Sequence, residues 1–253
     1  MMSRVVSWYS HGAASAVATK LALLDGPVDI VCCEVKEEHP DNKRFREDCE
    51  EWFGQKINII GNDEYKRSID EVFWRRKYLS GHSGAPCTLL LKKQMREEYQ
   101  RPDDVQVMGY TAEEQGRVDR FIDANNDVNL VTPLIDRGLG KSDCLAMVQD
   151  AGIELPEMYK LGYKNNNCMG CVKAQSPAYW KKIQLDFPKR FRIMQGLELI
   201  TGAKICKITV DGVPDVRVSL GELPEDIEPM DDSPDIQCGI FCEMAEQDIR
   251  SKE

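Results

Sequence analysis

The residues of this chain best suited to chemistry are its cysteines, of which there are ten among 253 residues. Cys168 and Cys171 form a C-x-x-C directly after three consecutive asparagines. This spacing lets two thiolates face one metal site, and the asparagine- and glycine-containing setting suits a tight loop with N–H groups directed at sulfur. Cys87 follows a proline at an expected helix start, where a thiol pKa is lowered and the thiolate is favoured. These three cysteines are therefore candidate metal ligands.

The spacing of the thiols leaves the bound group open. An iron–sulfur cluster, a zinc ion held by the C-x-x-C and two further thiolates, a redox-active dithiol and no metal are all compatible with it. The chain begins without the layout of a signal peptide, so we expect a cytoplasmic protein and favour metal or redox chemistry over a disulfide framework. Five further cysteines are expected to be structural, because they lie in apolar segments or have no partner motif: Cys32, Cys33, Cys49, Cys144 and Cys206.

A second candidate site is the loop Ser10–Ser15, between an expected strand and an expected helix. A tight turn in that position directs backbone N–H groups and the positive end of the helix dipole at one point. Gly12 allows close approach, and Ser10 and Ser15 add hydroxyl groups. The loop fits an anion such as phosphate or sulfate, and an ordinary turn with serine caps has the same spacing. His11 within it is either a phosphate contact or an exposed side chain.

This loop, Ser10-x-Gly12-x-x-Ser15, resembles that of the PP-loop (adenine nucleotide alpha hydrolase-like) superfamily, whose usual pattern is Ser-Gly-Gly-x-Asp-Ser. His11 and Ala14 depart from the pattern, and the resemblance is to the branch that includes the phosphoadenosine-phosphosulfate (PAPS) reductases. It extends over roughly residues 5–172. The fold it implies is an α/β nucleotide-binding domain.

Two later segments continue the resemblance. Glu38 lies after the second expected strand, where the family has a Phe-Pro-Glu-Thr-like loop near the nucleotide. Gly109, Glu114 and Arg117 lie in a segment similar to the family's Gly-x-Arg-x-x-Glu-Ser-x-x-Arg, without its first arginine. The ligand is expected to be an adenine nucleotide: ATP, adenosine phosphosulfate (APS) or PAPS. The resemblance implies these nucleotide-binding residues: Ser10, His11, Gly12, Ser15, Glu38, Gly109, Glu114 and Arg117.

The cysteines resemble those of the iron–sulfur APS reductases, which have Cys-Cys-x-x-Arg-Lys at a helix start and a later Cys-x-x-Cys. Cys87, Lys92, Cys168 and Cys171 match these positions, and Thr88 replaces the second cysteine. The resemblance implies a [4Fe–4S] cluster, which we favour over zinc. The cluster has either three protein ligands and an open iron, or a fourth ligand from the tail. Lys92 is expected to pair with an anionic substrate or with the cluster.

The tail segment Cys238-Gly239-Ile240-Phe241 resembles the mobile Cys-Gly-Leu/Ile-His end of these reductases, with Phe241 in place of histidine. By this resemblance, Cys238 attacks the sulfur of a sulfonucleotide and forms a thiosulfonate. Another thiol, or a thioredoxin-like electron donor, then resolves it. Cys238 and Lys92 are thus the implied catalytic residues, and Cys242 is a candidate metal ligand.

The leading hypothesis is a PAPS/APS-reductase-like iron–sulfur enzyme, an oxidoreductase. One alternative is ATP-dependent sulfur transfer to a nucleic acid through adenylation, as in other PP-loop enzymes. The other is a non-catalytic nucleotide or redox sensor, which the altered loop permits. Both enzyme hypotheses require binding of an adenine nucleotide. Release of pyrophosphate from ATP in the presence of RNA or DNA would favour sulfur transfer over the reductase.

Composition narrows the partners. The formal net charge is −10, which counts against a general polyanion binder and leaves a local basic cleft open. No apolar run approaches the roughly 20 residues of a membrane span, so we expect no membrane partner. A small-molecule nucleotide is the expected substrate, and a homodimer is compatible with the sequence.

Short apolar runs alternate with helical stretches, which predicts βαβ units and a mainly parallel sheet flanked by helices. The expected strands are 4–9, 28–35, 57–60, 105–109 and 129–132. The expected helices are 14–24, 42–53, 88–99, 112–122, 141–151, 178–185 and 188–200.

The predicted organisation is a nucleotide-binding domain over residues 1–204 and an extension over 205–253. Within the extension, residues 205–220 alternate around Asp211-Gly212 and predict a β-hairpin. Residues 222–235 are acidic, carry three prolines and predict a surface linker. The cysteine-bearing tail follows the linker.

Overall fold

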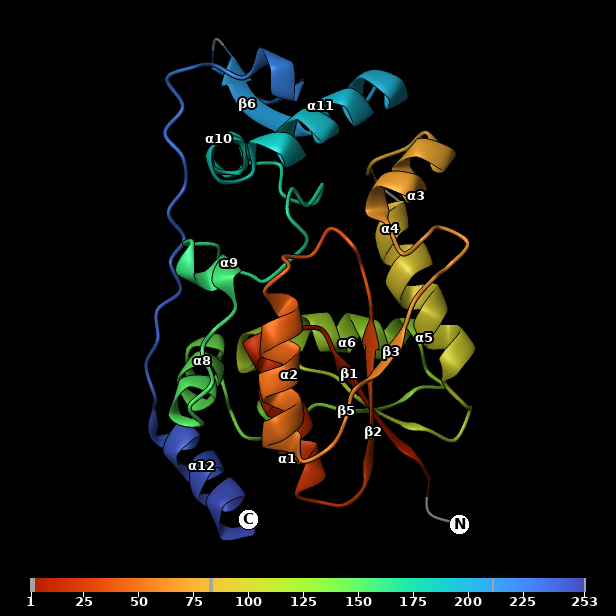
Figure 1. Ribbon diagram of the computed structural model, residues 1–253, viewed down its shortest axis with the longest axis vertical. Helices are drawn as coiled ribbons and strands as arrows, with labels where there is room; N and C mark the ends of the chain where they lie inside the picture. The colour runs from red at the N-terminus through yellow and green to blue at the C-terminus, as the bar shows by residue number, and fades with distance from the viewer. Residues whose placement is uncertain (1–2, 82–83, 211, 253) are drawn as a thin grey trace.

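A five-stranded, all-parallel sheet forms the centre of the computed structural model, which describes residues 3–81, 84–210 and 212–252 (Figure 1). The strand order β3-β2-β1-β4-β5 places the first strand in the middle of the sheet. Its strands are β1 (Val5–Tyr9), β2 (Val28–Cys33), β3 (Asn58–Ile60), β4 (Val105–Val107) and β5 (Asn129–Val131). The predicted α/β fold with a mainly parallel sheet is confirmed.

Helices cover both faces of this sheet. On one face, α1 (Ala13–Leu23), α2 (Asn42–Phe53) and α8 (Lys141–Asp150) enclose a core rich in alanine, valine and leucine. On the other face, Tyr99 at the end of α5 (Gln94–Tyr99) packs edge-on against Trp8, with ring centroids 6.0 Å apart. Parallel strands need such crossover helices, because the chain must return to the same end of the sheet before the next strand begins.

The helix predicted over residues 88–99 is interrupted. The structure has α4 (Pro86–Thr88), then a π-helical turn (Leu89–Lys93), then α5. Before them lies α3 (Ile69–Arg76), which the sequence did not predict and which Ser68 caps by accepting a hydrogen bond from the Glu71 amide at 3.3 Å. π-Helical turns concentrate at functional sites, and this one carries Lys92.

A second apolar cluster lies beyond the carboxyl end of β2. It joins α3 to α10 (Pro177–Asp186), α11 (Pro188–Thr201) and the antiparallel hairpin of β6 (Cys206–Val210) and β7 (Val213–Val218). The hairpin occurs where it was predicted, and Asp211 of its turn lies outside the described residues. The predicted domain boundary at residue 204 stays a prediction. Residues on its C-terminal side pack into both apolar clusters.

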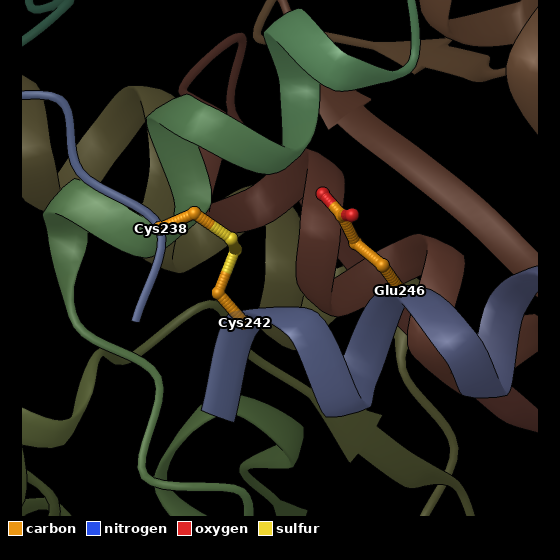
Figure 2. A group of neighbouring side chains, drawn as sticks. All are labelled: Cys238, Cys242 and Glu246. Atoms are coloured by element: carbon orange, nitrogen blue, oxygen red, sulfur yellow. A yellow bond between two sulfur atoms is a disulfide. The ribbon is translucent and has the colours of Figure 1, made fainter. Parts of the chain in front are cut away.

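The predicted linker leads to a helix that the sequence did not predict. After the 3₁₀ turn Leu220–Glu222, residues 223–239 form an extended strap along one side of the molecule to α12 (Ile240–Lys252) (Figure 1). Cys242, Ala245 and Ile249 bury one side of α12 in the sheet-side core. A Cys238–Cys242 disulfide lies where the strap meets α12 (Figure 2).

The remaining short elements are 3₁₀ turn Ala112–Glu114, α6 (Gln115–Ala124), α7 (Pro133–Asp136) and α9 (Glu157–Lys160). Within the described ranges, no helix has the length and apolar character that crossing a membrane requires.

Candidate functional site

A cavity of about 780 Å³ collects the three predicted metal ligands of the cysteine motifs. Cys87, Cys168 and Cys171 all line it, together with Lys92. Cys87 comes from α4 and the other two from the loop before α10, so the fold joins segments that are far apart in the sequence. The thiols and an amine therefore share one solvent-connected space.

The C-x-x-C loop is fixed by its backbone. The Met169 amide donates to the Glu37 carbonyl at 2.9 Å, and the Cys171 amide donates to the Tyr179 hydroxyl at 2.9 Å. Gly170 has a φ of +67°, and a Cβ there would come within 3.3 Å of the Trp180 ring. The tight loop predicted from the asparagine–glycine setting is therefore packed rigidly against α10.

A half-buried ion pair supports the same loop from outside the cavity. Arg190 on α11 pairs with Asp70 on α3 at 2.6 Å and donates to the Met169 carbonyl at 3.0 Å. The Arg190 side chain is 7% exposed and that of Asp70 is 30% exposed, so this half-buried pair joins α3, α11 and the cysteine loop. The sequence did not indicate this supporting role.

The thiol acidity differs from the prediction. Burial raises the pKa of Cys87, and the nearby Cys171 raises it further, against smaller opposing effects of Lys173 and Lys92. Burial likewise raises the pKa of Cys168. The prediction that the helix start lowers the Cys87 pKa is wrong, because desolvation of the thiolate outweighs the helix position. Burial therefore favours the neutral thiol over the thiolate at both side chains.

Lys92 is joined to the first loop through Glu38. Lys92 Nζ lies 3.0 Å from Glu38 Oε1, and His11 Nδ1 lies 2.8 Å from Glu38 Oε2. Burial raises the pKa of Glu38, but the charge of Lys92 and the hydrogen bond from His11 lower it to about 2. The Glu38 carboxylate in turn raises the pKa of Lys92. Glu38 thus fixes the charge of a lysine that lines the cavity, and its predicted role at a nucleotide stays a prediction.

His11 is not exposed, which was one of the two roles predicted for it, and a contact with phosphate stays a prediction. Its backbone is left-handed, with a φ of 57°, and its side chain is 7% exposed and directed at Glu38. Histidine tolerates this conformation better than β-branched residues do. The Sγ atom of Cys32 lies 3.7 Å from His11 Nε2. The imidazole is therefore buried beneath the loop, and the loop contributes backbone and serine groups to its outer surface.

Polar groups of the Ser10–Ser15 loop form hydrogen bonds with one another. The Ser10 amide donates to Ser15 Oγ at 3.0 Å, and Ser15 Oγ donates to the Gly12 carbonyl at 2.9 Å. The Tyr159 hydroxyl lies against the backbone of Ala13, while burial raises the pKa of Tyr159 to about 12. Ser10 remains exposed, and Gly12 caps α1 without a side-chain hydrogen bond.

Asn166 connects the cysteine loop to the first loop and was not predicted as a site residue. Its Nδ2 donates to the His11 carbonyl at 2.6 Å and to Asn42 Oδ1 at 2.8 Å. Asn166 Oδ1 is buried and has no hydrogen-bond partner in the described part of the chain. The run of asparagines before the C-x-x-C was the available signal, since a buried amide can join two loops.

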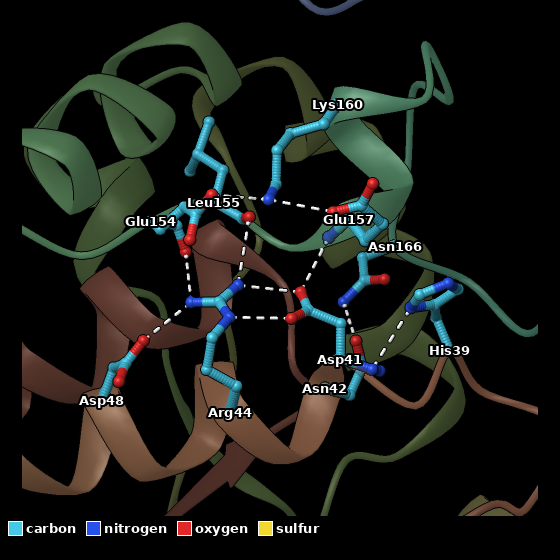
Figure 3. A network of polar contacts seen from close by, with 10 residues as sticks. All are labelled: His39, Asp41, Asn42, Arg44, Asp48, Glu154, Leu155, Glu157, Lys160 and Asn166. Carbon is cyan, nitrogen blue, oxygen red and sulfur yellow. Dashed lines mark hydrogen bonds and ion pairs between the residues drawn. The ribbon is translucent and has the colours of Figure 1, made fainter.

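A polar network holds the segment before Asn166 against α2 (Figure 3). Arg44 pairs with Asp41 at 2.7 Å and donates to the Glu154 carbonyl at 3.0 Å. Asp41 also accepts from the Glu157 amide at 2.9 Å. The start of α2 therefore fixes α9 and the approach to the cysteine loop.

The residues after β4 are divided in their roles. A Cβ at Gly109 would lie 2.7 Å from the Ser15 Cα, so the end of β4 approaches the first loop as closely as glycine allows. Glu114 and Thr111 form a capping box at the 3₁₀ turn Ala112–Glu114, and Glu114 also pairs with Arg117 at 2.6 Å. Arg117 is 62% exposed and lines the cavity, whereas Glu114 does not.

The tail cysteines are not in the cavity. Cys238 and Cys242 form a disulfide, the other eight cysteines are free, and neither tail residue lines the cavity. The Gly239 amide donates to Asp143 Oδ1 at 3.0 Å, which fastens this segment to the start of α8. The prediction that Cys242 completes one site with the cavity thiols is therefore not met in this arrangement, and Cys238 has no free thiol. Cys238, Cys242 and Glu246 form a separate group that could hold a metal ion.

The strap contributes to the cavity instead. Met230 and Asp232 line it, and their amides donate to the Ala178 and Gly162 carbonyls at 3.1 and 2.9 Å. The other charged residues of the lining are basic: Lys92, Arg117, Lys164 and Lys173. The cavity thus combines thiols with an excess of positive charge, which suits an anionic ligand.

The chemistry open to this arrangement is thiolate binding of a metal or cluster next to a basic, anion-accepting surface. No protein-family model matches this chain, and no curated protein matches it either.

Proposed function

We propose that this protein is a PAPS/APS-reductase-like enzyme that holds an iron–sulfur cluster in the cavity and acts on an adenine sulfonucleotide. The supporting observation is that Cys87, Cys168 and Cys171 line one cavity with Lys92, which is joined through Glu38 to the Ser10–Ser15 loop. The predicted metal site and the predicted anion loop are thus neighbours in space.

The resemblance to the iron–sulfur APS reductases favours a cluster over zinc, and the spacing of the thiols is compatible with it. Among described residues, only Cys238, Cys242 and Glu246 have three metal-ligating atoms within 4.8 Å of one another. At least one pair of the cavity sulfur atoms is therefore farther apart than this. Tetrahedral zinc, with Zn–S bonds of about 2.3 Å, holds its sulfur atoms roughly 3.8 Å apart. The thiolates of a [4Fe–4S] cluster bind different iron atoms and lie farther from one another.

The sheet topology supports the place of the nucleotide. In open parallel sheets, ligands bind beyond the carboxyl ends of the strands where the strand order reverses. Here that point lies between β1 and β4, next to which the Ser10–Ser15 loop and Gly109 meet. Arg117 follows on the same side and supplies a cation at the cavity.

The residues of the cavity then have distinct tasks. Lys92 neutralises an anionic group of the substrate, because Glu38 keeps its ammonium charged. Cys87, Cys168 and Cys171 would hold the cluster, which would supply a redox-capable centre. By the resemblance, Cys238 supplies the attacking thiol, which requires prior reduction of its disulfide by an external thiol. Its attack forms the S–S bond of a thiosulfonate and releases the nucleotide; a thiol then displaces sulfite and forms a disulfide.

The test is calorimetry with ATP, APS and PAPS on the reduced protein, followed by an assay for sulfite. We expect one sulfonucleotide to bind and to yield sulfite, and Lys92→Ala to reduce the yield by at least about tenfold. Absence of binding by every adenine nucleotide would remove the proposal at its first step.

ATP-dependent sulfur transfer to a nucleic acid is the second candidate. The observation in its favour is that, among the described residues, three cysteines line the cavity, which would leave one cluster position without a cysteine. Lys164 and Lys173 line the same cavity. Release of pyrophosphate from ATP that depends on added RNA or DNA, without sulfite formation from any sulfonucleotide, would favour this candidate.

A further inference from the structure

The tail presents three metal-ligating groups at one point outside the cavity. The sulfur atoms of Cys238 and Cys242 and a carboxylate oxygen of Glu246 all lie within 4.8 Å of one another. Figure 2 shows the disulfide and the Glu246 carboxylate on the same side of α12. Cys242 and Glu246 are four residues apart on a helix, which brings their side chains to one face.

The carboxylate of Glu246 has few hydrogen-bonding and cationic partners among the described residues. Its Oε1 atom is buried and has no hydrogen-bond partner among the residues that the structure describes. Its only ion pair in that part of the chain is with Arg250, at 3.1 Å. The Asp150 carboxyl lies beside it, and both line a small cavity of about 120 Å³. Two adjacent carboxyl groups either share a proton, as the hydrogen bond between Asp150 and Glu246 allows, or bind a cation, and the unpartnered Oε1 is open to a cation.

The surrounding structure holds the three groups in place. Cys242 is fully buried between α12 and the core, where Sγ lies 3.9 Å from the Asp143 carbonyl. The Gly239 amide donates to the Asp143 side chain, which keeps the preceding residue, Cys238, close to Cys242. The ligands are thus positioned by packing that does not depend on the disulfide alone.

We propose that Cys238, Cys242 and Glu246 form a zinc site when the disulfide is reduced. Reduction by a dithiol, which itself becomes a disulfide, breaks the S–S bond and leaves two thiols. Binding of Zn²⁺ releases their two protons and forms two Zn–S bonds, with the carboxylate of Glu246 as the third protein ligand. Two thiolates select Zn²⁺ over Ca²⁺ or Mg²⁺, which take oxygen ligands.

This site would keep the tail docked under conditions that remove the disulfide. A thiol pool of low potential reduces exposed disulfides, and Cys238 is exposed. Zinc in the same place would hold α12 and the end of the strap against α8. Cys238 is also the attacking thiol of the proposed reaction, so zinc bound here would hold that thiol outside the cavity. Metal binding by the tail is measured without any assay of activity, so the failure of one proposal can be told from the failure of the other.

The experiment uses the full chain with Cys87, Cys168 and Cys171 changed to serine, so that the cavity thiols cannot bind the metal. The protein is reduced with a phosphine under argon and titrated with Co²⁺, then with Zn²⁺. We expect a single Co²⁺ per chain with a thiolate charge-transfer band, displaced by Zn²⁺. Oxidised protein, Cys242→Ser and Glu246→Gln should each bind at least about tenfold more weakly. Glu243→Gln, at an exposed position on the same helix, is the matched control and should leave binding unchanged.

The proposal is overturned if the reduced chain binds neither ion, or if binding survives in the oxidised protein or in Cys242→Ser. Alkylation of Cys238 in the reduced chain with native tail gives a measurement that needs no tail substitution. Zinc should slow alkylation at least about tenfold, and an unchanged rate would also contradict the site.

Discussion

Asn166 donates a hydrogen bond from its side chain to the backbone carbonyl of His11, at 2.6 Å. This bond joins the loop of the C-x-x-C to the loop predicted to bind phosphate, two segments more than 150 residues apart in the chain. Asn166 also donates to Asn42, so the same amide reaches the start of α2. The two candidate sites are therefore parts of one structural unit.

Replacing Asn166 by alanine should loosen both loops. The His11 carbonyl and Asn42 Oδ1 would lose a buried donor, which costs about 1–3 kcal/mol in the free energy of unfolding. Urea unfolding followed by circular dichroism measures this loss. Asn167→Ala, at an exposed position in the same run, is the control. Equal stability of the two variants would show that the Asn166 bonds contribute nothing.

The ion pair of Glu38 predicts a pH dependence of stability. Its pKa is lowered to about 2 in the folded state, against about 4.3 in an unfolded chain. A carboxyl with a depressed pKa stabilises the fold above its unfolded pKa, and this contribution disappears as the pH falls through the folded value. The difference between the folded and unfolded pKa values corresponds to roughly 3 kcal/mol in the free energy of unfolding near neutral pH.

Glu38→Gln should therefore be less stable than the wild type near neutral pH, and the gap should narrow between about pH 5 and about pH 2. Chemical unfolding across that range measures it. Glu97→Gln is the control, because Glu97 forms an exposed pair with Lys93 at 3.7 Å that is worth little. A gap that does not change with pH would contradict the ion pair.

Gly109 predicts a steric effect on the first loop. A methyl group there would lie 2.7 Å from the Ser15 Cα, and backbone cannot move aside cheaply. Gly109→Ala should cost about 1–3 kcal/mol of stability and weaken nucleotide binding. Gly116→Ala lies in α6, where the nearest atom to the added methyl is Arg120 at 3.9 Å. That control should instead gain roughly 0.5–1 kcal/mol, and a similar loss in both variants would argue against the close approach.

Patterns of local sequence were sufficient for most of the sheet and its helices. The strand–helix alternation from Val5 onward predicted the parallel sheet, and α2 has the predicted bounds of Asn42–Phe53. The helix α12 was missed, because its buried side of Cys242, Ala245 and Ile249 is only recognisable once α1 and α8 are in place.

The site residues were predictable to the extent that their chemistry is local. Cys87, Cys168 and Cys171 were found from spacing, and the cavity brings them together. The inward direction of His11 was not predictable, since it depends on a left-handed backbone and on the burial of Glu38. The pairing of Cys238 with Cys242 likewise depends on the docking of the strap on α8, which no local pattern specifies.

The iron and sulfide content of the anaerobically purified chain tests most directly whether Cys87, Cys168 and Cys171 hold a cluster. We predict about four iron and four sulfide per chain, with broad visible absorption, lost when any one of the three is changed to serine. The double variant Cys238→Ser/Cys242→Ser should retain both, because the tail cysteines do not line the cavity. A colourless, iron-free chain that contains zinc, or cavity variants that keep their iron, would contradict the cluster.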